Sequence, residues 1–288
     1  MPTIRLAHSP DADDAFMFYG LAEGKIPTAD RAYVHELADI QTLNERAMRG
    51  ELDVTAVSIH AYAHLTEAYA LLSHGASMGD RYGPRLVARE AAAGDPRAAI
   101  RGRRVAVPGP LTTAYLALKL YQADFEPVMT PFDRIEDVVL AGEVDCGLLI
   151  HEGQLTYARR GLHLWVDLGE WWFGETRLPL PLGGNAIRRA LGPKLMVQVS
   201  RDLRASIAYG LEHRDDALRY ALSFARGLDR STTDEFVGMY VNQLTLDYGE
   251  RGRRAVRMLL ERGAKAGLVP PGEVSFVDDG MARQLTRC

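Results

Sequence analysis

The chain has 288 residues, of which 47% are hydrophobic and 25% are charged, and its formal net charge is −4 at pH 7. This composition is typical of a soluble globular protein and excludes the collagen-like, low-complexity and intrinsically disordered classes. The slight negative charge provides no general basic field for nucleic acid or anionic lipid, so we expect neither a nucleic-acid partner nor a membrane partner.

The cysteine count and the N-terminal residues bear on the cellular compartment. Cys146 and Cys288 are too few for a disulfide framework or a cysteine metal site, which fits a reducing compartment. The N-terminus, MPTIRLAHSP, lacks the basic and apolar regions of a secretory signal peptide. We therefore expect a cytoplasmic protein. The arginines clustered at 101–104 and 251–257 are expected to form solvated faces rather than a binding patch.

The first predicted elements are a strand at Ile4–Ala7 and a helix at Ala15–Glu23, joined by a turn at Ser9–Asp14. The turn holds three carboxylates, Asp11, Asp13 and Asp14. Carboxylates at a helix start are typical caps, favoured by the helix dipole. Because ligands of α/β sheets bind at the carboxyl ends of strands, the alternative is that at least one of the three faces a cleft.

Two further strands are predicted at Tyr33–Leu37 and Leu52–Ser58, separated by a helix at Ile40–Arg49. Ser58 lies between the second of these strands and a helix predicted at Ile59–Leu65. A serine in this position is ordinarily an N-cap. Its hydroxyl and the neighbouring backbone N–H groups also suit an anion, so both interpretations stay open.

We expect a strand at Arg85–Ala88 to be the last strand of the first domain before the crossing. The composition break at Ala88–Pro96 predicts this crossing into a second domain. Val105–Val107 is then the first strand of that domain, followed by a small-residue turn and a helix at Ala114–Tyr121. The threonine pair at the helix start repeats the arrangement at Ser58. It indicates either a second anion-binding turn or ordinary caps.

The stretch VDCGLLIHEGQLTY, residues 144–157, places ionisable residues at the end of an apolar strand. Cys146–Ile150 is a continuous apolar run, typical of a strand covered on both faces of a parallel sheet. His151 and Glu152 follow at its carboxyl end. An imidazole there suits a base near neutral pH. A histidine that only hydrogen-bonds a loop carbonyl would produce the same pattern.

The rest of the chain contains a tryptophan pair at 171–172 and a proline-rich segment at Leu178–Ile187. We expect the tryptophan pair to pack in the core or at a domain interface, and the alternative is that it lines a pocket for a flat ligand. The prolines argue against a central strand and predict the return crossing. From Val197 onward the pattern is mainly helical. We expect two α/β lobes around a hinged cleft, with 1–92 and 186–288 in a large domain and 93–185 in a small one.

The order and spacing of several motifs resemble a known family. The motifs are SPDADDAFMFYGLAEGKI, VTAVSIHAYAHL, VAVPGPLTTAYLALKLY, GEVDCGLLIHEGQLTY, DLGEWW and LPLPLGGNAI. From Ile4 to about Leu259, the chain is similar to the 1,4-dihydroxy-6-naphthoate synthases of the futalosine route to menaquinone. The resemblance implies a two-lobed α/β fold like that of type II periplasmic binding proteins, with a ligand cleft between the lobes.

The resemblance also implies an activity and site residues. The family is thought to convert cyclic dehypoxanthine futalosine, a small-molecule carboxylate, to 1,4-dihydroxy-6-naphthoate by base-initiated fragmentation, with no metal and no organic cofactor. Its proposed base, the histidine of the LIIHE motif, corresponds to His151 here, and we expect Glu152 to orient the ring. The family's substrate contacts and its N-terminal aspartate correspond to Ala56, Val57, Ser58, Thr113, Ala114 and Asp14.

The first motif departs from the family pattern SPCPNDTF, because Asp11, Asp13 and Ala15 replace a cysteine, an asparagine and a threonine. Additional carboxylates near a cleft disfavour an anionic substrate and raise neighbouring pKa values, unless they are solvated or capping. The departure leaves room for a paralogue that binds or converts a related small carboxylate. Because fold does not fix function, a solute-binding module and a chorismate dehydratase of similar fold are further alternatives. The missing signal peptide and the His151–Glu152 pair argue against the solute-binding module, and the first motif and the motif around His151 argue against the chorismate dehydratase. The sequence does not determine the oligomeric state.

Overall fold

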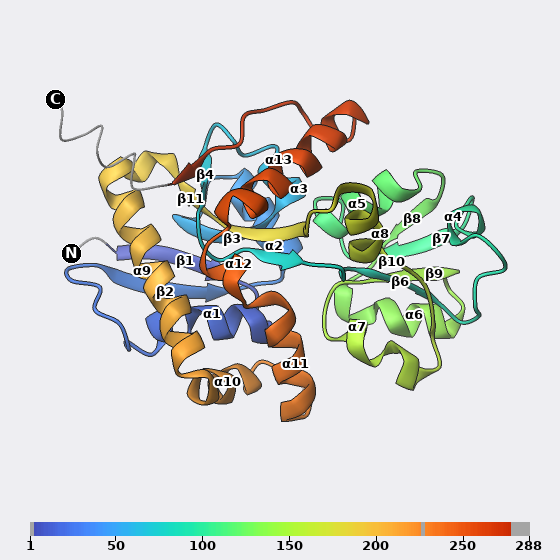
Figure 1. The fold of residues 1–288 in the computed structure, drawn as a ribbon, viewed down its shortest axis with the longest axis horizontal. Helices are drawn as coiled ribbons and strands as arrows, with labels where there is room; N and C mark the ends of the chain where they lie inside the picture. The colour runs from blue at the N-terminus through green and yellow to red at the C-terminus, as the bar shows by residue number, and fades with distance from the viewer. Residues whose placement is uncertain (1–2, 226–227, 278–288) are drawn as a thin grey trace.

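The structure, a computed structural model, describes residues 3–225 and 228–277, which form two β-sheets flanked by helices. Figure 1 shows the two sheets side by side along the long axis, each with its own helices. We call the half with the first sheet the first lobe and the other half the second lobe. The predicted two-lobed α/β architecture is confirmed.

The first sheet combines strands from the two ends of the described chain. They are β1 (Thr3–His8), β2 (Ala32–Leu37), β3 (Val54–Ser58), β4 (Tyr69–Leu72), β5 (Ser77–Gly79), β11 (Leu180–Arg188) and β12 (Phe276–Val277). Their order is β12-β4-β11-β3-β1-β2, and β5 pairs with β11. β1 is parallel to β2 and β3, whereas β11 is antiparallel to β3 and β4. The carboxyl ends of β1 and β3 therefore lie at one edge of this sheet.

The second sheet is formed by the middle of the chain. Its strands are β6 (Arg85–Ala88), β7 (Arg104–Val107), β8 (Glu126–Met129), β9 (Cys146–Leu149) and β10 (His163–Asp167), in the order β10-β6-β9-β7-β8. β7 is parallel to β8 and β9, and β6 is antiparallel to β9 and β10. All four residues of β9 are buried, as the apolar run predicts, and burial raises the pKa of the Cys146 thiol to about 12. Cys288 lies outside the described residues.

The first crossing between the sheets differs from our expectation. β6 pairs with β9 and β10, so the chain crosses before Arg85 and not near Ala88–Pro96. Val105 therefore does not begin the second sheet. The composition break is an exposed surface loop, because small and polar residues suit a solvated loop as well as a linker. The domain boundaries at 92/93 and 185/186 stay predictions.

The proline-rich segment Leu178–Ile187 was wrongly excluded as a central strand. β11 lies between β3 and β4, in the interior of the first sheet. Pro181 pairs only with β5, at a register shift, and the ladder with β3 and β4 runs from Gly183 to Arg188. A proline is tolerated at a strand end because the central hydrogen bonds do not need its missing N–H.

Helices flank both sheets. The first lobe contains α1 (Ala12–Ala22), α2 (Ile40–Met48), α3 (Ile59–Tyr62), the 3₁₀ turn η3 (Arg189–Leu191), α9 (Pro193–Glu212), α10 (Arg214–Leu222), α11 (Arg230–Tyr240), α12 (Gln243–Leu246) and α13 (Gly249–Lys265). The second lobe contains α4 (Pro96–Ala99), α5 (Thr113–Tyr121), η1 (Phe132–Arg134), α6 (Ile135–Ala141), α7 (Gly153–Thr156), η2 (Tyr157–Arg160) and α8 (Leu168–Thr176). The predicted helical C-terminal part is confirmed.

Helix α1 is enclosed by the rest of the first lobe and begins three residues earlier than predicted. Every residue from Ala12 to Leu21 is buried, and the helix packs against α9 and α10. Its contact with α9 is close: a Cβ added at Gly20 would lie 2.9 Å from Ser206 Cα. Ser206 Oγ accepts a hydrogen bond from the Leu21 N–H at 3.1 Å and donates to the Met17 carbonyl at 2.8 Å. These contacts fix the position of the α1 N-terminus, which carries the carboxylate turn.

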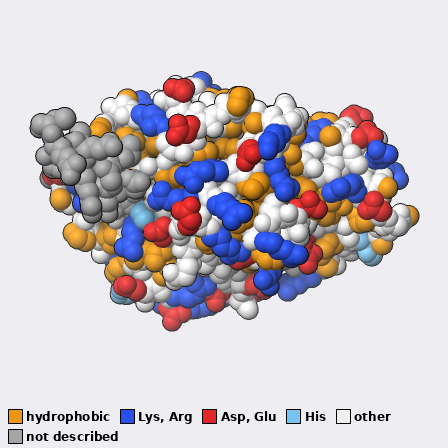
Figure 2. Space-filling view, turned by 45° about the horizontal axis from the view of Figure 1, so that its top comes forward, with side chains coloured by type: hydrophobic (Ala, Val, Ile, Leu, Met, Phe, Trp, Pro, Cys, Tyr) orange, Lys and Arg blue, Asp and Glu red, His pale blue; other side chains and the backbone are white. Residues whose placement is uncertain are grey.

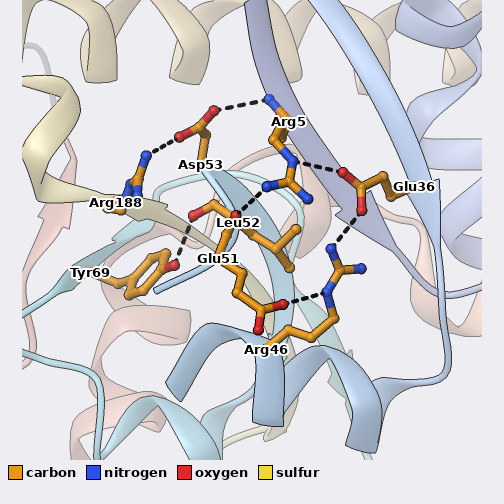
Figure 3. Close-up of polar contacts among 8 residues, drawn as sticks. All are labelled: Arg5, Glu36, Arg46, Glu51, Leu52, Asp53, Tyr69 and Arg188. Atoms are coloured by element: carbon orange, nitrogen blue, oxygen red, sulfur yellow. Dashed lines mark hydrogen bonds and ion pairs between the residues drawn. The ribbon is translucent and has the colours of Figure 1, made fainter. Parts of the chain in front are cut away.

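An ion-pair network ties strands of the first sheet together (Figure 3). Glu36 accepts hydrogen bonds from Arg5 Nε at 2.9 Å and from Arg46 at 2.6 Å, and the bond with Arg5 is the main reason why its pKa is lowered. Asp53 accepts from the Arg5 backbone N–H at 3.0 Å and from Arg188 at 2.5 Å. The network thus links β2, β1 and β11 through the segment that precedes β3.

The arginine cluster at 251–257 makes contacts within the protein. Arg251 forms a bidentate ion pair with Asp80, at 2.7 and 2.9 Å, and the Arg253 guanidinium lies 4.8 Å from the centre of the Phe276 ring. Figure 2 shows Lys and Arg side chains interspersed with Asp and Glu side chains on this face. Within residues 3–225 and 228–277, none of the helices has both the length and the apolar character that crossing a membrane requires.

We predict that Gly20→Ala lowers the free energy of unfolding by about 1–3 kcal/mol, because the added methyl group meets backbone atoms of α9 that cannot rotate away. The matched control is Gly174→Ala in α8, where the added Cβ has no heavy atom within 4 Å. This control is expected to gain about 0.5–1 kcal/mol. Urea unfolding of both variants tests the prediction, and equal stability changes would contradict it.

Candidate active site

A cleft lies between the lobes, where the carboxyl ends of β1, β3, β7 and β9 face one another. The space between the side chains that line it is about 740 Å³, a figure that includes open solvent. Every site residue predicted from the sequence lines this one cleft: Asp14, Ala56, Val57, Ser58, Thr113, Ala114 and His151. The second lobe contributes His151, Thr113 and Ala114, and the first lobe contributes the others.

His151 follows β9 in the cleft wall, and its side chain is 14% exposed. Its Nδ1 lies 3.2 Å from Asp11 Oδ2, and the ring centre lies 3.9 Å from that of Phe132. Its Nε2 is buried and has no hydrogen-bond partner among the described residues. The partner of the ring is therefore a carboxylate and not the loop carbonyl of the alternative interpretation, and one ring nitrogen is left for a ligand.

Asp11 is the N-cap residue of α1, yet its side chain makes no capping hydrogen bond. Instead, Oδ2 accepts a hydrogen bond from Ser9 Oγ at 2.7 Å and faces His151. Asp14 Oδ2 accepts from the Ser9 backbone N–H at 2.8 Å. All three carboxylates of the turn, Asp11, Asp13 and Asp14, line the cleft. The expectation that at least one of them faces a cleft is therefore met by each.

Burial of these carboxylates changes their protonation. Burial raises the pKa of Asp13 well above its ordinary value, and the neighbouring Asp14 and Asp11 raise it further. Burial also raises the pKa of Asp14 to about 7, although the Ser9 N–H opposes this shift by stabilising the carboxylate. The turn consequently carries less negative charge at neutral pH than three solvated carboxylates would, which reduces its repulsion of an anionic ligand.

The turn at Ser58 differs in detail from the predicted anion site. Ser58 makes no side-chain cap of α3. Its backbone N–H donates to Asn44 Oδ1 at 2.9 Å, and its Oγ accepts from Asn44 Nδ2 at 3.0 Å. The His60 N–H donates to Thr113 Oγ1 at 3.1 Å. Two of the N–H groups that we expected to bind an anion are therefore used within the protein, and the Ser58 hydroxyl proton is the donor that this turn can offer.

At the start of α5 the two threonines have different roles. Thr112 is the cap, because its Oγ1 accepts a hydrogen bond from the Tyr115 N–H at 3.4 Å. Thr113 Oγ1 donates to the Leu182 carbonyl at 2.5 Å and so connects the second lobe to the returning chain. The first N–H groups of a helix have no intrahelical acceptor, so those of Thr113 and Ala114 suit an anion at the cleft wall.

A group of three residues beside the cleft has the composition of a metal site. Asp11, His151 and Glu152 each offer one ligand atom, and these atoms lie within 4.8 Å of one another. Carboxylate and imidazole ligands suit divalent cations such as Zn²⁺. Glu152 is 6% exposed, so its carboxylate lies in the same buried environment as Asp11. The prediction that the protein needs no metal therefore requires a direct test.

The cleft also contains residues that the sequence did not single out, among them Ile40, Gly75, Ser77, Asn185, Phe236 and Tyr240. Asn185 Nδ2 donates to the Gly75 carbonyl at 3.1 Å, and its buried Oδ1 has no partner within the described part of the chain. A polar residue inside the apolar run of β11 was the one local signal for this position. Tyr240 lies in α11, and no local motif indicated its place in the cleft.

The fold has counterparts among solved structures. A crystal structure of an Archaeoglobus fulgidus protein is 49% identical, with a TM-score of 0.88 over 93% of this chain and 98% of that chain. The alkanesulfonate-binding protein of Xanthomonas axonopodis, solved with MOPS, is 14% identical, with a TM-score of 0.68 over 93% and 94% of the two chains. The second likeness is one of fold alone. The chain therefore has the two-lobed fold of the periplasmic binding proteins.

Sequence comparison identifies the family. The family model described as menaquinone biosynthesis matches residues 4–265. A 1,4-dihydroxy-6-naphthoate synthase of Thermus thermophilus is 42% identical over 271 residues, which are 94% of this chain and 97% of that protein. The chain belongs to this menaquinone biosynthesis family, as the sequence motifs predicted.

We predict that Asp14 makes stability pH-dependent. Its folded pKa of about 7 exceeds the unfolded value of about 3.9, so its stabilising contribution is complete below the unfolded pKa and is lost as the pH rises through 7. From about pH 4 to about pH 8, the wild-type free energy of unfolding should fall by about 1–4 kcal/mol more than that of Asp14→Asn.

Urea unfolding across this pH range measures the effect. The control is Asp216→Asn, since Asp216 lies on α10 with its side chain 52% exposed, and this variant should follow the wild type. A pH dependence of Asp14→Asn that matches the wild type would show that Asp14 does not carry the raised pKa.

Proposed function

We propose that this chain is a cytoplasmic carbon–carbon lyase of menaquinone biosynthesis that converts cyclic dehypoxanthine futalosine to 1,4-dihydroxy-6-naphthoate. In this proposal, His151 is the base that removes a proton from the bound substrate and so initiates fragmentation. The family membership and the name of the Thermus thermophilus relative support the proposal.

The arrangement of His151 is the observation that carries the proposal. Its Nε2 has no hydrogen-bond partner among the described residues, and the side chain lines the cleft between the lobes. A base must lie within hydrogen-bond reach of the proton that it removes, so the proposal requires that substrate in the cleft brings its C–H group to this nitrogen, which has no partner among the described residues. The burial of Nε2 also keeps bulk water from competing for the nitrogen.

The remaining lining residues suit a carboxylate substrate. The N–H groups of Thr113 and Ala114 at the start of α5, together with the Ser58 hydroxyl, supply donors on the two sides of the cleft. Asn185 Oδ1 is an acceptor that can receive a hydrogen bond from a substrate hydroxyl or amide. Holding the substrate from both lobes would place its acidic C–H group against His151.

A second candidate is a paralogue that binds or converts a related small carboxylate. The observation in its favour is the carboxylate turn, where Asp11 and Asp13 stand at positions occupied by uncharged residues in the family motif, and both face the cleft. Their charge disfavours a strongly anionic ligand beside α1. This candidate predicts binding of cyclic dehypoxanthine futalosine without product, or turnover of a different molecule.

We predict that the purified protein forms 1,4-dihydroxy-6-naphthoate from cyclic dehypoxanthine futalosine, followed by mass and absorbance. Substitution His151→Gln should lower kcat by about 10²- to 10⁴-fold, because the variant lacks the base while the binding residues stay in place. The control is His163→Gln in β10, an exposed histidine of the same lobe that should retain full activity. Near-wild-type turnover by His151→Gln would disprove the assignment of the base.

We also predict that activity survives removal of metal ions, because the proposed base needs none. The assay is turnover after dialysis against EDTA, with metal content measured by mass spectrometry. If turnover were lost on dialysis and restored by Zn²⁺ or Mn²⁺, then Asp11, His151 and Glu152 would be a metal centre and the base mechanism would be wrong.

A further inference from the structure

We propose that Asp11 is a positioning residue that orients His151 from the opposite lobe, so that the base is assembled only when the two lobes meet. The inference rests on the proposed function for its catalytic meaning. Its structural basis is separate: Asp11 follows β1 in the first lobe, His151 follows β9 in the second, and Asp11 Oδ2 lies 3.2 Å from His151 Nδ1.

Hydrogen bonds within the first lobe hold the Asp11 carboxylate in place. Ser9 Oγ donates to Asp11 Oδ2 at 2.7 Å, and the Ser9 N–H donates to Asp14 Oδ2 at 2.8 Å. Asp11 is 6% exposed and starts a helix that is buried from Ala12 to Leu21. A carboxylate fixed in this way acts as a rigid partner for the imidazole rather than as a mobile surface charge.

The imidazole is restrained on its second side. The Phe132 ring centre lies 3.9 Å from the His151 ring centre, which limits rotation of the imidazole. A carboxylate at Nδ1 favours the tautomer with its proton on Nδ1, because the carboxylate oxygen is then an acceptor for that N–H. The lone pair is thereby placed on Nε2, the nitrogen that has no partner within the described residues. Asp11 thus selects which nitrogen acts as the base.

The contact also makes the base depend on closure of the cleft. If the lobes separate, the distance between Asp11 and His151 increases and Nδ1 loses its acceptor. A second hydrogen bond joins the lobes on the same side of the cleft, from Tyr240 Oη in α11 to Gln154 Oε1 in α7 at 2.9 Å. Substrate that draws the lobes together would therefore bring Asp11 to Nδ1 and bind against Nε2 in the same step.

Two other carboxylates, those of Glu152 and Asp14, also interact with His151. A test of Asp11 must therefore leave both unchanged. Glu152 follows it directly, with a ligand atom within 4.8 Å, and the His151 ring lowers the pKa of Asp14 through its charge. Both stay in place when Asp11 is replaced. Ser9 Oγ and His151 Nδ1 both contact Asp11 Oδ2, so an asparagine oxygen in that place would still accept from the ring. The variant that removes the acceptor is therefore Asp11→Ala.

The first readout is the tautomer of the His151 ring, taken from its ¹⁵N shifts in ¹H–¹⁵N NMR on histidine-labelled protein, with the signals assigned by their loss in His151→Gln. We expect the proton on Nδ1 in the wild type. In Asp11→Ala the shifts should move toward the Nε2–H tautomer, because Nδ1 has lost its acceptor. Substitution Asp216→Ala, an equal truncation at an exposed position on α10, should leave the tautomer unchanged.

The second readout is activity on cyclic dehypoxanthine futalosine. We expect Asp11→Ala to lower kcat by about 10- to 100-fold with KM changed less than about threefold. Substitution Ser9→Ala, which removes the Ser9 hydrogen bond to the Asp11 carboxylate, should produce a smaller change in the same direction. It replaces Asp11→Ala if that variant does not fold.

The outcomes distinguish this inference from the proposed function. A folded Asp11→Ala with the wild-type tautomer of His151 would overturn the inference, whatever the substrate. An altered tautomer with a wild-type kcat would overturn the positioning role. If the wild type does not turn over this substrate but the tautomer changes as expected, the Asp11–His151 pair stands and the substrate assignment fails.

Discussion

A buried carboxylate of one lobe and an imidazole of the other meet across the cleft, and the arrangement of the site depends on this contact. Asp11 and His151 each follow the carboxyl end of a strand, and a strand end can reach the opposite lobe only if the two sheets present these ends to each other. The chain achieves this by crossing between the sheets twice, before β6 and before β11. The cleft is thus a consequence of the topology, and its chemistry comes from the first residues beyond the strands.

The carboxylate turn illustrates the opposing demands on such a site. Burying Asp11, Asp13 and Asp14 together is unfavourable, and burial raises the pKa values of Asp13 and Asp14 as a result. The rigid attachment of α1 to α9 and the hydrogen bonds of Ser9 hold the turn in place despite this repulsion. The buried carboxylates lower the stability of this part of the structure, and they stay shielded from water beside a ligand. Such an arrangement is typical of catalytic sites.

Elements with strong local patterns were predicted well, and elements defined by their partners were not. The apolar run at β9 and the helices after Val197 follow from residue patterns alone. The assignment of β6 to the second sheet depends on pairing with β9 and β10, and no feature of its four residues specifies that partner. The position of β11 was missed for a related reason, since a proline-rich start hides a strand whose ladder begins at Gly183.

The sequence by itself determined the α/β class, the family, and several of the residues that line the cleft, because strand ends, helix starts and motifs are local in the chain. Only the tertiary structure decided which of these residues touch. It placed Asp11 Oδ2 at 3.2 Å from His151 Nδ1, directed the Ser58 N–H to Asn44, and brought Asn185 into the cleft. Such contacts join segments far apart in the chain, and they are set by how the two sheets pack, which local periodicity does not encode.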